Sequence, residues 1–287
     1  MHLTTLFLIL LAALFHSIWN ILAKNSRNNL TLLWLQMVIT AVILLPYSLL
    51  IFDFPVIDAW PTLLFTSAMQ ITYYILLSRC YRSGNLSIVY PLTRGSAPVF
   101  VCLFSMLLGT ENLSLPIILS LLLTVFGIYL VNMPELTLAS LTAPFKVLKK
   151  DKTTRLSILI GIIVAAYTIS DKRNVLYCDP LLVYTVICVI PALCLAPFML
   201  RKRALKEELT HGGWFRALAV AAFTFLAYYL VLAAMRSCDA SYVSSIREVS
   251  VVFVAIYTCL KNKETQWKSK ITGSVIIFIG IFLLAYL

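Results

Sequence analysis

Residues 86–108 read LSIVYPLTRGSAPVFVCLFSMLL, an apolar run of 23 residues with one formal charge, Arg94. At about 1.5 Å per residue, a helix of this length spans roughly 34 Å and can cross a bilayer. Near the centre of such a span a charge costs roughly 2.5–3.5 kcal/mol to insert. Because arginine keeps its proton, we expect Arg94 to face a water-filled cavity, an internal acid or an anionic ligand. Pro91, Gly95 and Pro98 predict a bend beside the charge.

The rest of the chain is equally apolar. Of its 287 residues, 61% are hydrophobic and 12% are charged, whereas about 25% of a soluble globular chain is charged. This composition indicates a polytopic membrane protein surrounded by lipid. The net charge of +11 does not point to nucleic acid as a partner, because the basic residues lie in short connectors between apolar runs, as the positive-inside rule describes.

Ten apolar runs are long enough to cross the membrane. They cover residues 4–23, 30–52, 60–79, 86–108, 113–132, 154–173, 180–200, 214–235, 240–260 and 268–287. The connectors after odd-numbered runs, with the run ends beside them, hold 18 lysines and arginines, and those after even-numbered runs hold 3. This bias predicts that the odd-numbered connectors are cytoplasmic and that both chain ends lie outside, in the cell's inner membrane.

The two halves of the chain resemble each other when one is shifted by about 154 positions. Trp60 then aligns with Trp214, and Arg94 with Glu248. Each half has five runs, an odd number, so the second half enters the membrane in the opposite sense. We therefore predict an all-α integral membrane protein with ten transmembrane helices, arranged as two inverted five-helix repeats around a central cavity. The expected divisions are a first repeat at 1–133, a basic cytoplasmic connector at 134–153 and a second repeat at 154–287.

Charged residues at the expected midplane form the first candidate site. Arg94 has Glu248 as its pseudo-symmetric counterpart, and Arg247 is the neighbour of that acid. One interpretation is a structural bridge between Arg94 and Glu248. The other is that one or both arginines bind an anionic substrate group while Glu248 tunes them. One acid cannot neutralise two arginines, which favours the second interpretation.

Two pairs of polar residues form the second candidate site. His16 and Asn20 lie four residues apart, as do Tyr167 and Asp171, so each pair shares one helix face. The repeat superimposes the two pairs at a shift of 151. A role in substrate or proton binding is one interpretation, with His16 as the pH-sensitive member. The alternatives are interhelical hydrogen bonds of about 1 kcal/mol or less each and, for Asp171, a position at the membrane interface.

An aromatic and amide set within the spans forms the third candidate site. Its members are Gln70, Tyr73, Tyr74, Tyr90, Tyr228 and Tyr229. A tyrosine buried within a span needs a partner for its hydroxyl, and a polar cavity supplies one. Ordinary packing is the alternative for any single tyrosine.

The sequence carries no signature of a cofactor, a metal or catalysis. The seven cysteines form no CxxC pair or cluster with histidine, so we expect them to pack as small residues. No GxxxxGK, GxSxG or HExxH motif is present. We therefore expect neither an enzyme nor a bound cofactor. A disulfide between Cys178 and Cys238, which fall on the same side of the predicted topology, is left open.

Three stretches, ALFHSIWNILAK (13–24), VYPLTRGSAPVF (89–100) and SSIREVSVVF (244–253), stand among ten spans split five and five. Together they resemble an EamA-type member of the drug/metabolite transporter superfamily. The resemblance implies a basket of ten helices around a central cavity, alternating access and secondary transport. It also implies that Arg94, Arg247 and Glu248 line the cavity.

The resemblance does not fix the substrate. The small cation-exporting relatives resemble a first-helix glutamate arrangement, whereas this chain has His16 and Asn20 in its first span. A proton/organic-cation antiporter is therefore not the expected function. We expect a secondary transporter of a small polar solute with an anionic group, such as an amino acid, an organic acid or a phosphorylated or phosphonate metabolite. The alternative is a flippase for a lipid headgroup or lipid-linked sugar, and homodimerisation is left open.

Overall fold

The computed structural model describes residues 3–24, 26, 28–53, 57–83, 86–131, 133, 137, 152–200, 203–209, 213–262 and 267–286. The first half forms α1 (Leu3–Lys24), α2 (Asn29–Ile51), the 3-10 turn η1 (Ile57–Ala59), α3 (Trp60–Ser83), α4 (Leu86–Leu107) and α5 (Leu115–Val131). The second half forms α7 (Lys152–Tyr177), α8 (Pro180–Met199), α9 (Arg203–Leu209), α10 (Gly213–Met235), α11 (Ala240–Arg247), α12 (Ser250–Asn262) and α13 (Trp267–Tyr286). The predicted basic connector 134–153 lies almost entirely outside the described residues.

Each predicted span corresponds to one helix, except that α11 and α12 share the ninth. Within the described residues, seven segments are long and apolar enough to cross a membrane. Helix α5 has 17 residues, which is near the lower limit of about 17 for a span. Helix α3 is long enough at 24 residues but carries the buried polar residues Thr66, Ser67 and Gln70. These polar residues lower the hydropathy of α3, but they face the interior of the protein.

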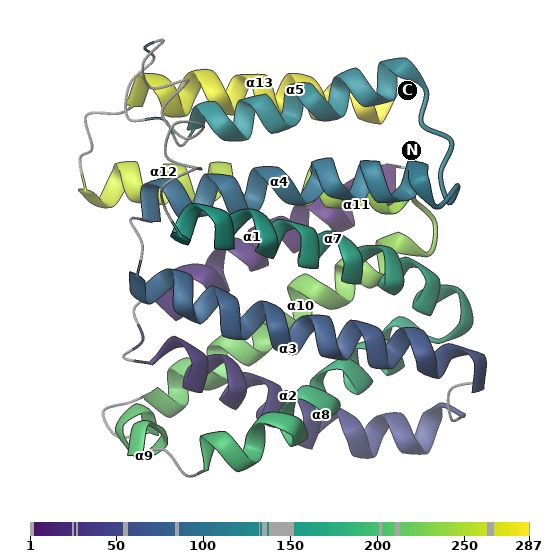
Figure 1. The fold of residues 1–287 in the computed structure, drawn as a ribbon, viewed down its shortest axis with the longest axis vertical. Coiled ribbons are helices and arrows are strands. Elements are labelled where there is room, and N and C mark those ends of the chain that lie inside the picture. The colour runs from purple at the N-terminus through teal and green to yellow at the C-terminus, as the bar shows by residue number, and fades with distance from the viewer. Residues whose placement is uncertain are drawn as a thin grey trace.

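Each contact between helices of the two repeats has a counterpart in which the repeats are exchanged. Helix α1 packs on α10, and its counterpart α7 packs on α3. Helix α4 packs on α7, and its counterparts α11 and α12 pack on α1. Helices α2 and α8 are counterparts that pack on each other, and so are α5 and α13. These two pairs lie at opposite ends of the molecule (Figure 1). A two-fold axis through both pairs is perpendicular to the helices and so lies in the membrane plane, which confirms the inverted repeat.

The fourth span does not break where the sequence suggests a distortion. Helix α4 runs unbroken from Leu86 to Leu107 and includes Pro91, Gly95 and Pro98. Membrane helices accommodate proline where neighbouring groups satisfy the freed carbonyls. The interruption lies instead in the ninth span, at Glu248 and Val249 between α11 and α12.

The break in the ninth span has a tertiary cause, because residues 240–260 contain neither proline nor glycine. The amide of Val249 donates to the carbonyl of Ile246 at 3.1 Å, and that of Val252 to Val249 at 2.8 Å. These bonds span three residues, as in a 3-10 turn. The hydroxyl of Ser17 on α1 donates to the carbonyl of Ser250 at 3.0 Å. A group from the other repeat thus stabilises the backbone beside the break.

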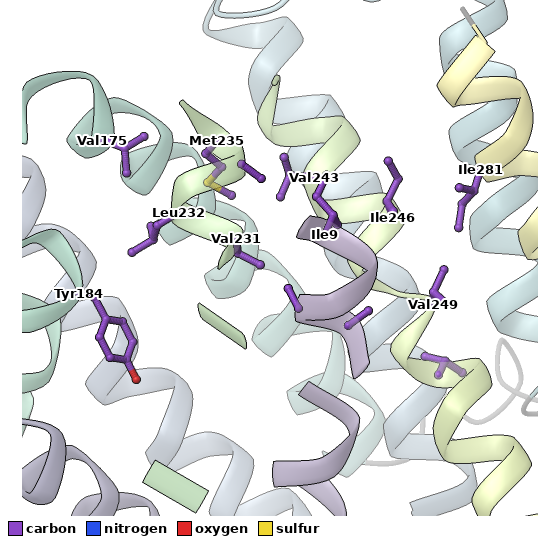
Figure 2. Packing of buried hydrophobic residues seen from close by; sticks show 14 of the residues in the cluster. Ile9, Val175, Tyr184, Val231, Leu232, Met235, Val243, Ile246, Val249 and Ile281 are labelled. Atoms are coloured by element: carbon purple, nitrogen blue, oxygen red, sulfur yellow. The ribbon is translucent and has the colours of Figure 1, made fainter. Parts of the chain in front are cut away.

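Two large apolar clusters form the core of the protein. We call the side where α1 begins and α13 ends the terminal side (Figure 1). There, Ile9 of α1 packs with Val243 and Ile246 of α11, and Val175 and Met235 belong to the same cluster (Figure 2). A second cluster reaches the opposite side and includes Ala23, Leu32, Cys80, Ile160 and Ala217. Both clusters extend to the middle of the helices, which we call the midplane.

Glycines bring α5 and α13 into close contact. A Cβ placed on Gly127 would lie 2.7 Å from the backbone nitrogen of Ile277 and 2.8 Å from the carbonyl oxygen of Gly273. A Cβ on Gly280 would lie 2.9 Å from the amide nitrogen of Thr124. These are backbone atoms that a rotamer change cannot move away. Small residues permit this approach, as in many membrane helix pairs.

We predict that Gly127→Ala lowers the free energy of unfolding by about 1–3 kcal/mol, because the added methyl group forces the α5 and α13 backbones apart. Thermal unfolding in detergent, followed by tryptophan fluorescence, measures the effect. The matched control is Gly95→Ala, whose Cβ would meet only the Cγ2 of Ile128 at an ordinary 3.8 Å. Equal melting temperatures for the two variants would contradict the close packing.

Candidate functional site

A cavity at the midplane is lined by three helices of each repeat. The lining consists of His16, Trp19, Gln70, Tyr73, Tyr74, Leu77, Thr93, Arg94 and Ala97 from α1, α3 and α4, and Val164, Tyr167, Thr224, Ala227, Tyr228, Arg247 and Glu248 from α7, α10 and the end of α11. These two sets of helices are pseudo-symmetric counterparts. The cavity has a volume of about 40 Å³, where one water needs roughly 10–15 Å³. In this conformation it has room for a few waters.

An ion triad occupies one wall of the cavity. The carboxylate of Glu248 is fully buried, and its Oε1 lies 3.7 Å from Nη1 of Arg94 and 3.7 Å from Nη2 of Arg247. Neither carboxylate oxygen accepts a hydrogen bond from a described residue. The ions therefore attract one another at a distance longer than a hydrogen bond. The lining presents two guanidinium groups and one carboxylate.

The helix break lies directly at the ion triad. Arg247 is the last residue of α11, and Glu248 follows as its C-cap, two residues before α12 begins at Ser250. A helix carries partial negative charge at its C-terminus. The end of α11 therefore favours the cation of Arg247, whereas Glu248 lies between this end and the start of α12.

His16 lies between two donors. The indole Nε1–H of Trp19, 3.2 Å from Nδ1 of His16, and the guanidinium of Arg94, whose Nη2 contacts Nε2, can only donate. A neutral imidazole accepts through one ring nitrogen, so His16 accepts from one of these donors at a time. When it accepts from Trp19, its Nε2–H becomes a second donor beside Arg94. An acceptor oxygen that reached this place could accept from both groups.

Tyrosines form the remaining polar wall. The ring of Tyr73 packs edge-on against Tyr74 at 5.0 Å and against Tyr167 at 6.1 Å between centroids. The hydroxyl of Tyr228 accepts from Nε2 of Gln70 at 3.0 Å and donates to Oδ2 of Asp171. Aromatic faces and hydroxyls together give the cavity a surface for both apolar and polar parts of a ligand.

Nine of the thirteen predicted site residues line this cavity, and three of the other four lie elsewhere. Asp171 lies behind Tyr228. Asn20 shares a helix face with His16, but its amide donates to the backbone carbonyl of His16 at 2.8 Å. The ring of Tyr229 stacks on Phe225 at 5.6 Å. The side chain of Tyr90 lies outside the described residues.

Sequence reasoning missed several lining residues that the repeat could have revealed. A shift of 154 aligns Thr224 with Gln70 and Thr93 with Arg247. In each pair one member was a candidate and the other was not. Trp19 lies three residues after His16, on the same helix face. Applying the repeat position by position would have identified the two threonines.

Metal and disulfide chemistry find no support among the described residues. No group of three or more histidine, cysteine, aspartate or glutamate side chains there lies close enough to hold a metal. Cys178 and Cys238 are both free thiols. The disulfide that the sequence left open is not formed in this structure.

The chain was compared with known proteins. A search of curated proteins finds no match, whereas 22 chains of solved structures match. One of these, a crystal structure of a protein, has a TM-score of 0.73 at 12% identity and aligns over 99% of this chain and 96% of its own. At that identity the similarity shows the fold alone. The model of the EamA-like transporter family matches residues 3–133 and 154–286. The chain therefore belongs to the EamA-like transporter family.

Proposed function

We propose that this protein is a secondary transporter of a small polar solute that carries an anionic group. Amino acids, organic acids and phosphorylated or phosphonate metabolites belong to this class. Family membership makes the chain a membrane transporter of small solutes. The preference for an anion rests on one observation: three hydrogen-bond donors, Arg94, Arg247 and His16, meet in a cavity that contains one carboxylate.

The pair formed by His16 and Arg94 is the proposed anion-binding centre. Both ring nitrogens of the imidazole face donors, and when His16 accepts from Trp19 through Nδ1, its Nε2–H becomes a second donor beside the guanidinium. A carboxylate or phosphate oxygen entering this place accepts from both groups. Charge-assisted hydrogen bonds of this kind are about twice as strong as neutral ones. A cationic solute gains no such contact there.

Glu248 has a second role in this proposal, because it holds the arginines while the site is empty. Its carboxylate lies 3.7 Å from each guanidinium. An entering anion can replace this attraction with direct hydrogen bonds. The tyrosine wall then contacts the remainder of the solute, which gives affinity without fixing a single shape.

Alternating access follows from the pseudo-symmetry. The cavity is too small for a solute in this conformation, so the helices must separate on one side to admit it. Because equivalent helices of the two repeats line the cavity, exchanging their conformations turns an opening on one side into an opening on the other. From the charge bias of the connectors, we assign the terminal side to the exterior of the cell.

The anion-binding role predicts that Arg94→Gln lowers transport at least tenfold, because one lost charged hydrogen bond is worth about 1.5–3 kcal/mol. The assay is uptake into proteoliposomes of a panel of labelled anionic, zwitterionic and cationic solutes. The matched control is Arg236→Gln, since Arg236 is 52% exposed and pairs with Asp179 at 3.7 Å away from the cavity. Unchanged uptake by Arg94→Gln, or uptake of cations alone, would overturn the proposed role of Arg94 in binding an anion.

Alternating access predicts that a cysteine in the cavity wall reacts with a small charged methanethiosulfonate. Ala227→Cys should be labelled above the level of the wild-type chain, and the transported solute should slow the reaction. Ala234→Cys, two turns further along the same helix and fully buried in the terminal-side cluster, should remain unlabelled. Equal labelling of both variants would argue against a solvent-reachable cavity at Ala227.

The assigned orientation predicts that, in intact cells, an impermeant thiol reagent labels Asp58→Cys and not Lys150→Cys. Asp58 lies in η1, which precedes α3 on the terminal side. Lys150 belongs to the predicted cytoplasmic connector. Both cysteines should be labelled once the cells are permeabilised. The reverse pattern in intact cells would invert the orientation.

A further inference from the structure

We propose that Asp171 is the proton-binding site of this protein and couples solute transport to a proton gradient. This inference rests on the proposed transport function but concerns a group outside the cavity wall. The Asp171 side chain lies on α7, is 1% exposed and reaches the cavity through one neighbour, Tyr228. Its assigned ligand is a proton, which the carboxylate takes from hydronium and returns to water when the site opens.

The hydrogen bonds of Asp171 leave one place for a proton. Its Oδ2 accepts from the hydroxyl of Tyr228. Its buried Oδ1 has no close hydrogen-bond partner among the described residues, although the hydroxyl of Thr66 and the amide of Asn174 lie beside the carboxyl group. Nearby, the amide of Asn174 donates to the hydroxyl of Thr66 at 3.3 Å. Protonation of Oδ1 would leave the hydrogen bond from Tyr228 to Oδ2 in place.

No described cation pairs with this carboxyl group within 4 Å. The adjacent Lys172 turns away, because its ammonium donates to the carbonyls of Met235 at 2.6 Å and Cys238 at 3.0 Å. The guanidinium of Arg173 lies over the ring of Tyr177. Burying an ionised carboxylate without a partner is costly, whereas a carboxylic acid there needs no counter-ion.

The groups that face Asp171 come from every helix packed against α7. Helix α10 contributes Tyr228, α11 contributes Arg247, and α7 itself contributes Tyr167. Helix α3 contributes the uncharged Thr66 and Gln70. Beyond these, Tyr184 of α8 packs on Tyr228, and Arg94 of α4 acts on Tyr167. The acid therefore experiences the positive charge of Arg247 without forming an ion pair with it.

Tyr228 provides the connection between the proton and the solute. Its hydroxyl bonds both Asp171 and Gln70, and it lines the cavity beside the ion triad. A solute that displaces this hydroxyl removes a hydrogen bond from Asp171 and changes the relative stability of its protonated and ionised forms. Binding of the solute and binding of the proton are therefore linked, and the linkage acts in both directions.

The position of Asp171 in α7 also gives its proton a route to water. It lies six residues before the end of α7 at Tyr177, about 9 Å along the helix, toward the terminal side. There α3 and α7 are joined by the hydroxyl of Ser170, which donates to the carbonyl of Thr62 at 3.0 Å, and by the bond between Asn174 and Thr66. Separation of these helices would expose the carboxyl group to water on that side.

The transport test uses proteoliposomes with a pH difference of one unit and the best-transported solute of the panel. At one proton per solute, the wild-type protein should accumulate the solute up to about tenfold. Asp171→Asn should retain solute exchange at zero gradient and lose accumulation. The matched control, Asp179→Asn, changes an acid in a surface ion pair and should accumulate as the wild-type protein does. Accumulation by Asp171→Asn, or accumulation driven by sodium alone, would overturn the proposal.

A spectroscopic test needs no solute and so separates this proposal from the transported class. The infrared difference spectrum between acid and alkaline pH should show the carbonyl stretch of a buried carboxylic acid. That band should vanish in Asp171→Asn and shift in frequency in Tyr228→Phe, which keeps the acid but removes its donor. A band unchanged in both variants would assign the proton elsewhere. Melting temperatures of the purified variants establish whether they are folded. If Asp171→Asn does not fold, the frequency shift in Tyr228→Phe decides the test.

Discussion

The ion triad of Arg94, Arg247 and Glu248 is the interaction on which the rest of the structure depends. It joins the repeats, because Arg94 belongs to the first and the other two residues belong to the second. It also coincides with the turn in the ninth span, where the C-terminus of α11 lies beside Arg247. The backbone stays hydrogen-bonded through this turn, by the bonds that Val249 and Val252 donate. The irregular backbone therefore occurs where the membrane interior holds ions.

The two repeats share a backbone arrangement but not its chemistry. The shift that superimposes them places Thr93 on Arg247 and Arg94 on Glu248, so charge is concentrated at positions whose counterparts differ. At a shift of 151, Asp171 falls on Asn20, which cannot bind a proton and bonds its own helix instead. Packing that is nearly symmetric allows two access states of similar energy. The asymmetric side chains underlie the proposed anion site and the proposed proton site.

The fold was largely predictable because apolar length and lysine and arginine placement are local properties of the sequence. The break at Glu248 was not, since its cause is a contact from Ser17 and the ion triad, neither of which the local sequence encodes. The adjacent Tyr73 and Tyr74 both line the cavity, whereas of Tyr228 and Tyr229 only Tyr228 does, and Tyr229 stacks on Phe225. The apolar pattern of the helix does not distinguish these two cases. Asn20 satisfied the face prediction, but its short side chain found a partner in its own backbone.

The long ion-pair distances are consistent with a protein that must release what it binds. At about 4 Å, two unit charges attract by roughly 4 kcal/mol at an effective dielectric constant of 20. An entering anion would weaken the attraction of Arg94 for Glu248 while supplying hydrogen bonds of similar magnitude. In the proposed mechanism, the net gain in free energy on binding is therefore small, so that a bound solute can leave again. A tightly hydrogen-bonded pair would exclude the solute, and two unopposed arginines would retain it; the geometry of Glu248 lies between these extremes.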